Sequence, residues 1–221
     1  MIRPFRLPFG LLLILIVLSA CGGAQTGPLS EIQQQVPKTL TVTSAAFREG
    51  ATIPTRYTCS DEDISPALAW SGAPANTIAF ALIFDDPDAG ATAFTHWLVA
   101  NIPASEQSLV ENTPRDATLP NGAMQGQNSA GKSGYVGPCP PPGDAHHYHF
   151  AVYALDATLS LEPGFSKQQL ASAMQRHTLA WGELVGLFAR SQSRRGASVL
   201  GQYVYPIDNV YLRWHSSPPV N

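Results

Sequence analysis

Short apolar runs, separated by segments rich in glycine and proline, make up most of the chain. The run at 78–84 is continuous, which is typical of a central strand buried on both faces. Two further runs, at 96–102 and 148–155, are rich in aromatic and branched residues and predict two more strands. Shorter β-like runs begin near Leu40 and cover 68–70. The pattern therefore predicts a mainly β domain.

One helix is predicted after these runs. Ser166 can cap its N-terminus, and Gln169 three residues later completes a capping-box pattern. Four later residues then share one helical face: Leu170, Ala173, Met174 and His177. We expect a second, short helical or mixed segment over 181–188.

The N-terminus has the features of an export signal. Arg3 and Arg6 precede an apolar run at 9–20, which is too short to span a bilayer comfortably. The run ends in small residues directly before Cys21, as at a signal-peptide cleavage site. This arrangement resembles a bacterial lipobox, which implies cleavage before Cys21 and acylation of that residue. The alternative is an ordinary signal peptide with a cysteine there by chance.

These features predict the organisation of the whole chain. We expect a signal peptide at 1–20, a lipid-attached flexible tether at 21–39 and one folded domain at 40–190. Residues 191–221 contain a strand-like stretch and are expected to pack on the domain. Acyl chains on Cys21 would hold the protein on a membrane, facing outside the cytoplasm, in the periplasm or at the cell surface.

Charge and cysteine content narrow the possible partners and the compartment. Thirteen Lys and Arg stand against 16 Asp and Glu without a basic run, so no nucleic-acid partner is expected. If Cys21 carries lipid, Cys59 and Cys139 remain as a pair, and an exporting pathway would let them form a disulfide. Closing so long a loop contributes up to about 4–5 kcal/mol in the chain-entropy model. The alternative is two free, buried thiols.

Three polar clusters carry the candidate chemistry. The first is the Asp- and Pro-rich turn at 85–90, where Asp85 is expected only to cap the central strand. The second is His96, which opens the next strand. A hairpin between the two strands would bring His96 back near Asp86 or Asp88.

The third cluster, at 134–148, is the densest in Gly, Pro, Tyr and His. Prolines fix the backbone, and glycines let the chain come close to a bound ligand. In the strand that follows, His146 and Tyr148 share one face, and His147 and His149 share the other. We expect one of these faces to be functional and the other to face solvent or to pack.

Together these motifs resemble the phosphatidylethanolamine-binding protein family, most closely its bacterial branch, often called Raf kinase inhibitor-like. The resemblance covers roughly residues 41–190, and the combination is far more specific than any single motif. The matching stretches are Cys59 with 63–66, Leu68 and Trp70; 86–89 with His96 and Trp97; 134–138 with Pro140, Pro141, Gly143, His146 and Tyr148; 152–155; and 182–186. Gly90 and Ala67 depart from the family pattern, because prolines usually stand there.

The resemblance implies a fold of packed antiparallel sheets with a few peripheral helices near the C-terminus, and a shallow pocket for phosphate-like anions. By motif position, the pocket walls would be Asp86, Asp88, His96, Gly137, Pro140, His146 and Tyr148. Protonated imidazoles and a phenol O–H can donate hydrogen bonds to anionic oxygens, while carboxylates orient the imidazoles. We therefore expect a surface-tethered binding protein for a phosphate or phospholipid headgroup, with a protein partner as a further expectation and no cofactor.

Two alternative functions stay open at this point. The His, Asp and Tyr side chains could carry out acid–base hydrolysis, although Ser129 and Ser133 lie in a Gly-rich loop rather than at a nucleophile elbow. Two His and two Asp could also bind zinc. Strand alternation separates His146 from His147 and His149, so no metal ligand is assigned. No catalytic residue is assigned either, because no convincing nucleophile lies near these side chains.

Replacing Cys21 by Ala is expected to abolish acylation and to release the protein from membranes, because this residue supplies the thiol and amine that carry the lipid. Mass spectrometry of the mature N-terminus and membrane fractionation measure both effects. An unmodified N-terminal residue in the mature wild-type protein would contradict the expectation.

Overall fold

The computed structural model of the chain describes residues 27–191. The predictions for the signal peptide, Cys21 and the C-terminal extension beyond 191 lie outside the described residues. Within 27–191, no helix is both long and apolar enough to cross a membrane.

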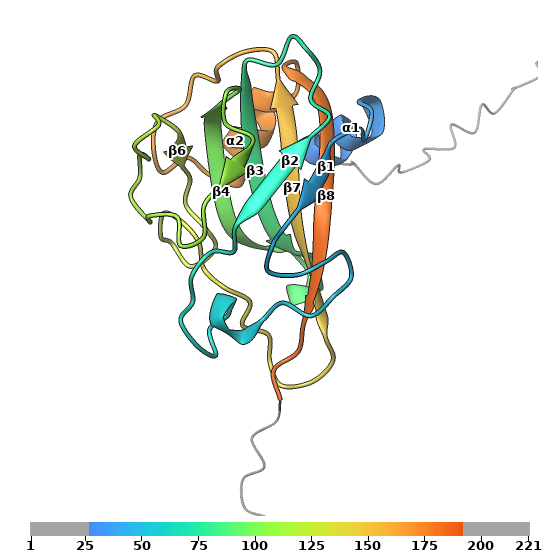
Figure 1. Ribbon diagram of the computed structural model, residues 1–221, viewed down its shortest axis with the longest axis vertical. Helices are drawn as coiled ribbons and strands as arrows, with labels where there is room; N and C mark the ends of the chain where they lie inside the picture. The colour runs from blue at the N-terminus through green and yellow to red at the C-terminus, as the bar shows by residue number, and fades with distance from the viewer. Residues whose placement is uncertain (1–26, 192–221) are drawn as a thin grey trace, which may run out of the picture. The chain divides into compact units, whose positions relative to one another are not determined.

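Two antiparallel sheets form the framework, as the fold class predicted (Figure 1). The larger sheet has the strand order β6-β4-β3-β7-β8, and the smaller has the order β1-β2-β5. The strands are β1 (Thr41–Thr43), β2 (Leu68–Ser71), β3 (Ala79–Asp86), β4 (Phe94–Pro103), β5 (Ser108–Leu109), β6 (Met124–Gln125), β7 (His146–Leu155) and β8 (Thr178–Phe188). The helices are α1 (Pro28–Gln35) and α2 (Lys167–Met174), with short 3₁₀ turns η1 (Thr55–Tyr57) and η2 (Pro87–Ala89).

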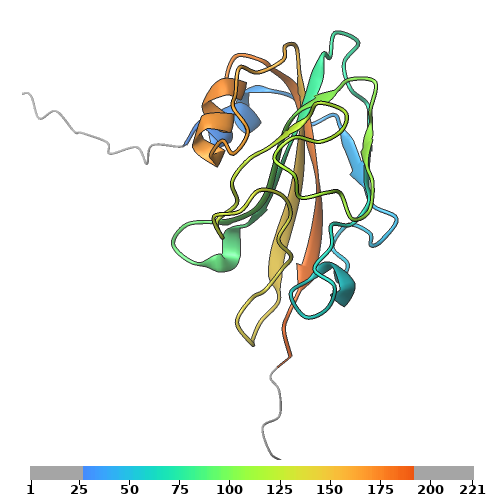
Figure 2. The same ribbon diagram turned by 90° about the vertical axis from the view of Figure 1, so that its left-hand side faces the viewer.

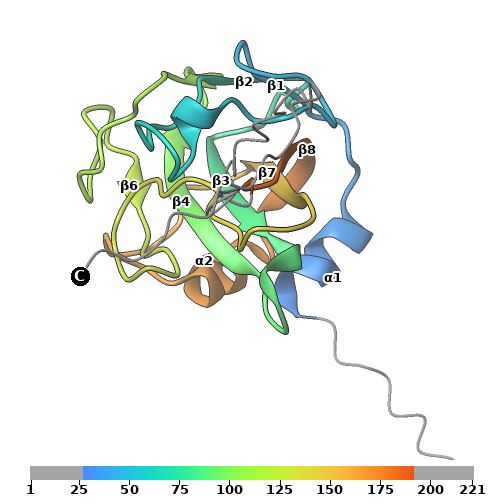
Figure 3. The same cartoon turned by 90° about the horizontal axis from the view of Figure 1, so that it is seen from below.

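Strand β3 lies in the middle of the larger sheet and is buried on both faces, as its continuous apolar run predicted. Alternate side chains of a strand point to opposite faces. Phe80, Leu82 and Phe84 accordingly pack between the two sheets, while Ala81 and Ile83 pack against the helices. The smaller sheet covers one face of the larger sheet, and α1 and α2 lie together on the other (Figures 2 and 3).

The predicted capping box of α2 is present. The Ser166 hydroxyl accepts a hydrogen bond from the Gln169 backbone N–H, and the Gln169 side-chain oxygen accepts one from the Ser166 backbone N–H. Leu170 and Met174 are buried against the sheet. The helix therefore begins where its sequence pattern indicated. It ends at Met174, so His177 lies beyond it, and Ala171 rather than Ala173 joins its buried face.

Helix α1 differs from the flexible tether expected over 21–39. Pro28 occupies its first turn, where a missing N–H has no cost, and Ile32 is only 2% exposed. Leu29 and Val36 pack beside Ile32 against the helix-covered face of the sheet. The apolar spacing at 29, 32 and 36 is helical, but the surrounding Gly and Gln residues obscured it.

The segment at 181–188 was expected to be helical or mixed, and this expectation was wrong, because it belongs to β8. Its buried positions include Gly182 and Gly186, which interrupt the apolar alternation that would have indicated a strand. A Cβ at Gly182 would collide with the Leu40 carbonyl oxygen, and one at Gly186 would lie 2.5 Å from Ile53 Cγ1. The glycines therefore allow the segments carrying Leu40 and Ile53 to cross the strand closely.

Gly186→Ala is expected to destabilise the domain by about 1–3 kcal/mol, the usual cost of forcing extra carbon into a packed core. Urea unfolding measures the difference. Gly27→Ala serves as the control, because a Cβ there would meet nothing within 4 Å. Equal stability of the Gly186→Ala protein and the wild type would contradict this account of β8.

Candidate binding site

A cavity of about 270 Å³ lies where β3 ends and where β4 and β7 begin. The loop at 134–145 closes its side. Its lining residues are Asp86, Ala89, Phe94, His96, Val136, Gly137, Cys139, Pro140, Pro141 and His146. Five of the seven residues predicted from the sequence are thus brought together here, namely Asp86, His96, Gly137, Pro140 and His146.

His96 is held in the cavity wall by a backbone contact and by aromatic packing. Its Nδ1 lies 2.8 Å from the Val136 carbonyl oxygen, and because a carbonyl can only accept, Nδ1 carries the hydrogen. The ring packs against Phe84 and Phe94, with centroid distances of 4.9 and 4.7 Å. Burial lowers the pKa of His96, and this outweighs the Val136 carbonyl and the Asp86 charge, which raise it. Only Nε2 of this ring remains for a guest in the cavity.

His146 is oriented by Asp86 from the neighbouring strand. Its Nδ1 lies 2.8 Å from Asp86 Oδ2, and Asp86 Oδ1 accepts a hydrogen bond from the Asp88 backbone N–H at 2.9 Å. Asp86 is only 3% exposed, and both of its oxygens have partners inside the protein. As in His96, Nε2 is the imidazole nitrogen left for a guest.

Packing against neighbouring residues, and not contact with a ligand, requires a glycine at position 137. Its N–H donates to Asp63 Oδ1 at 2.6 Å, and a Cβ on it would lie 2.5 Å from the Tyr57 carbonyl oxygen. Arg115 in turn donates to Asp63 Oδ2 at 2.9 Å. Asp63 and Arg115 were not assigned to the site from the sequence, although Asp63 lies in one of the matched motifs. The position of Arg115 depends on folding alone, so no local pattern could have indicated it.

Two predicted wall residues do not line the cavity. Asp88 Oδ2 instead accepts hydrogen bonds from the backbone N–H and Nδ1 of His147, both at 2.8 Å, and these contacts lower the pKa of Asp88. Tyr148 is fully buried behind the two imidazoles, with its ring centroid 5.4 Å from that of His96 and 6.3 Å from that of His146. Burial, more than the nearby Asp86 charge, raises the pKa of Tyr148. Tyr148 therefore supports the imidazoles from behind.

The other two histidines of β7 do not line the cavity. His147 contacts Asp88, and His149, on the face of the sheet opposite to His146, has its Nδ1 2.9 Å from Glu183 Oε2. Together with His146, each of these three histidines contacts a different carboxylate. Across residues 27–191, no group of three or more His, Cys, Asp or Glu side chains is arranged to hold a metal ion.

The predicted disulfide between Cys59 and Cys139 is present, with an Sγ–Sγ distance of 2.01 Å. Cys139 lines the cavity, and the Cys59 N–H donates to the Pro138 carbonyl oxygen at 3.1 Å. The bond ties the loop at 134–145 to the segment after η1. It therefore restrains the part of the cavity wall that has no regular secondary structure.

The family model described as "Phosphatidylethanolamine-binding protein" matches residues 43–189. The chain belongs to this family. A UPF0098 protein of Methanothermobacter thermautotrophicus is 49% identical over 145 residues, which cover 66% of this chain and 95% of the relative. A Mycobacterium tuberculosis protein named "Putative lipoprotein LppC" is 35% identical over 192 residues, which cover 80% of this chain and 92% of the relative.

A solved structure agrees with the phosphatidylethanolamine-binding protein assignment. The crystal structure of Escherichia coli YbcL, described as a member of the mammalian family, superimposes with a TM-score of 0.65 and 34% sequence identity. The superposition covers 69% of this chain and 99% of YbcL. The superposition thus includes nearly all of YbcL, and the residues matched by the family model, 43–189, include those that line the cavity.

Because burial lowers the pKa of His96 in the folded protein, the unfolded chain binds more protons than the folded one as pH falls through about 6.5. The stability that neutral His96 contributes is therefore present above this pH and is lost below it. His96→Asn, which keeps a donor near the Val136 carbonyl, is expected to flatten the fall in unfolding free energy between about pH 7 and 5. Imidazole resonances measured by NMR give the pKa directly, and a His96 midpoint above 6.5 would contradict the account.

Proposed function

We propose that this member of the phosphatidylethanolamine-binding protein family binds a small phosphate-like anion in the cavity at the ends of β3, β4 and β7. One observation carries the proposal. His96 and His146 both use Nδ1 for a fixed contact inside the protein, with Val136 and Asp86 respectively, which leaves two Nε2 atoms on the cavity wall. Two oriented imidazoles suit the paired oxygens of a phosphate group.

The charge of the site makes binding depend on protons. With Nδ1 already donating to Val136, a neutral His96 presents a lone pair at Nε2 and must gain a proton before it can donate to an anion. Burial opposes that proton, whereas a bound anion favours it. The buried Asp86 carboxylate repels anions, but its contacts with His146 and the Asp88 N–H reduce this effect. We therefore expect modest affinity that increases at lower pH.

The size of the cavity favours a headgroup over a whole lipid. A volume of about 270 Å³ is slightly below the range of pockets for drug-sized ligands. Phe94, Pro140 and Pro141 add apolar walls beside the imidazoles. A phosphate with a short organic substituent fits these walls, and an acyl chain would have to lie outside.

We also propose that the domain acts outside the cytoplasm on a lipid anchor. The supporting observations are the sequence around Cys21, the disulfide between Cys59 and Cys139, and the similarity to a relative named as a lipoprotein. An anchored domain would meet anionic headgroups or phosphorylated solutes at the membrane surface. A protein partner at the cavity rim is compatible with the same location.

Calorimetry with glycerophosphoethanolamine tests the anion site, because this phosphodiester keeps the same charge while His96 gains its proton. Binding is expected to strengthen as pH falls through about 6.5 and below, because burial holds the pKa of His96 under its ordinary value. His96→Ala and His146→Ala should each weaken binding by about 1.5–3 kcal/mol, the scale of a hydrogen bond to a charged group.

His177→Ala is the control, since His177 contacts Asp156 away from the cavity and should leave binding unchanged. Inorganic phosphate and phosphoethanolamine extend the ligand series. Absence of binding at every pH, or binding that is indifferent to both His96→Ala and His146→Ala, would contradict the proposal.

The Asp86–His146 pair also has the form of an oriented base, which keeps hydrolysis as the competing function. The lining residues include no Ser, Thr or Lys, and Cys139 is in a disulfide. Ser129 uses its hydroxyl to accept a hydrogen bond from the Thr95 N–H and does not line the cavity. Release of phosphate from phosphoethanolamine that disappears in His146→Ala would favour the enzyme.

A further inference from the structure

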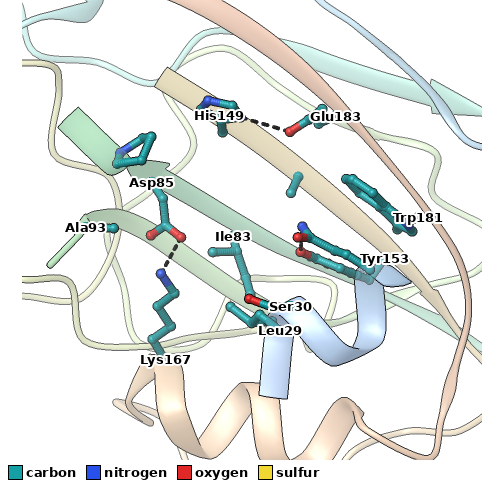
Figure 4. A pocket seen from close by; sticks show the side chains of 13 residues that line it. Leu29, Ser30, Ile83, Asp85, Ala93, His149, Tyr153, Lys167, Trp181 and Glu183 are labelled. Atoms are coloured by element: carbon teal, nitrogen blue, oxygen red, sulfur yellow. Dashed lines mark hydrogen bonds and ion pairs between the residues drawn. The ribbon is translucent and has the colours of Figure 1, made fainter. Parts of the chain in front are cut away.

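A second cavity, of about 450 Å³, lies on the opposite face of the larger sheet, between the strands and the two helices (Figure 4). Side chains alternate between the two faces along β3 and β7, so these strands contribute different residues to each cavity. Asp85 lines this cavity whereas Asp86 lines the first one, and His149 lines this cavity three positions after His146. The α1 residue Leu29 and the α2 residue Lys167 complete its walls (Figure 4).

One of the two carboxylates in this cavity is fully compensated. Glu183 accepts from Nδ1 of His149 at 2.9 Å and from Nζ of Lys38 at 2.7 Å. These contacts, the histidine first, lower the pKa of Glu183 to about 2. The same pair raises the pKa of His149. Both oxygens of Glu183 therefore already have a basic partner.

The other carboxylate has unused hydrogen-bonding capacity. Asp85 Oδ2 lies 2.5 Å from Nζ of Lys167, but Asp85 Oδ1 is buried and meets no donor from residues 27–191. A buried acceptor without a donor is costly. Asp85 was expected only to cap its strand, and the structure instead places it at one end of an open cavity.

Lys167 has no favourable electrostatic partner in its own helix. It is the first residue of α2, where the helix dipole disfavours a positive charge, and no acidic residue occupies the first turn. Its side chain reaches from the helix to Asp85 (Figure 4). The ammonium group of Lys167 thus occupies the position in which Asp85 would hold the ammonium group of a ligand.

The rest of the cavity is apolar and aromatic. Ile83 and its strand partner Ala151 lie next to Asp85 in the cavity wall. At the far end the rings of Tyr153 and Trp181 stack with their centroids 6.3 Å apart. Lys38 Nζ already lies 4.9 Å from the Trp181 ring centroid, so this ring accepts a cation. Asp85 pairs with His149, which is four residues from Tyr153, so the two ends are about 13 Å apart along the strand.

We propose that the second cavity binds a small organic cation, a primary ammonium group carried on an apolar or aromatic body, and that Lys167 occupies the ammonium position when the cavity is empty. The ligand ammonium replaces Lys167 Nζ on Asp85, which keeps the carboxylate compensated. The body extends over Ile83 and Ala151 towards Tyr153 and Trp181. An anion is disfavoured, because it would meet Asp85 at close range.

Calorimetry with 4-phenylbutylamine tests the proposal, because this amine spans most of the distance between Asp85 and Tyr153. The wild-type protein should bind it at least tenfold more tightly than it binds the uncharged 4-phenylbutanol. Asp85→Asn should lose at least tenfold in affinity. Lys167→Met keeps a long unbranched side chain but removes the competing ammonium group, so this variant should bind the amine severalfold more tightly than wild type.

Asp156→Asn is the matched control, because among residues 27–191 Asp156 also contacts a single basic partner, His177 at 2.9 Å, but lies outside the cavity. It should leave amine binding unchanged. Circular dichroism verifies that each variant is folded. Undetectable binding of the amine to both wild type and Lys167→Met, equal binding of the alcohol, or weaker binding in Lys167→Met would overturn the proposal. This outcome is independent of anion binding at the first cavity, which depends on His96 and His146.

Discussion

The burial of β3 on both faces is the constraint on which the rest of the structure depends. A strand in the middle of a five-stranded sheet sends alternate side chains to opposite faces, and here each face is covered, one by the smaller sheet and the other by two helices. The strand ends in consecutive aspartates, so the same alternation sends Asp86 to one side and Asp85 to the other. Its neighbour β7 divides His146 and His149 in the same way. Two cavities of different chemistry therefore lie back to back across one sheet.

The two cavities differ in how their carboxylates are engaged. Both oxygens of Asp86 have internal partners, so this residue orients His146 rather than contacting a guest. Asp85 has one oxygen on a flexible Lys side chain and one without a donor among the described residues. Burial of His96 adds a further difference, because it makes the first cavity sensitive to protons. Burial favours a neutral His96 when the cavity is empty, and an anion bound there would favour its charged form.

The features that could be predicted from the sequence are those with local or periodic signals. The continuous apolar run of β3 identified the central strand, the Ser166 and Gln169 pair identified the start of α2, and period-two alternation separated His146 from His149. Strand β8 was missed because glycines occupy positions of its buried face, where close crossing of neighbouring segments excludes side chains. The contact of Arg115 with Asp63 depends on residues far apart in the chain, and no local pattern reports such a pairing. The unused oxygen of Asp85 is also a property of packing alone.

A crystal structure of the protein soaked with phosphoethanolamine tests the central claim, that two oriented imidazoles make the first cavity an anion site. The account predicts phosphate oxygens within hydrogen-bonding distance of Nε2 of both His96 and His146, with the Nδ1 contacts to Val136 and Asp86 retained. A phosphate group bound elsewhere, or bound in this cavity without contact to either imidazole, would contradict it.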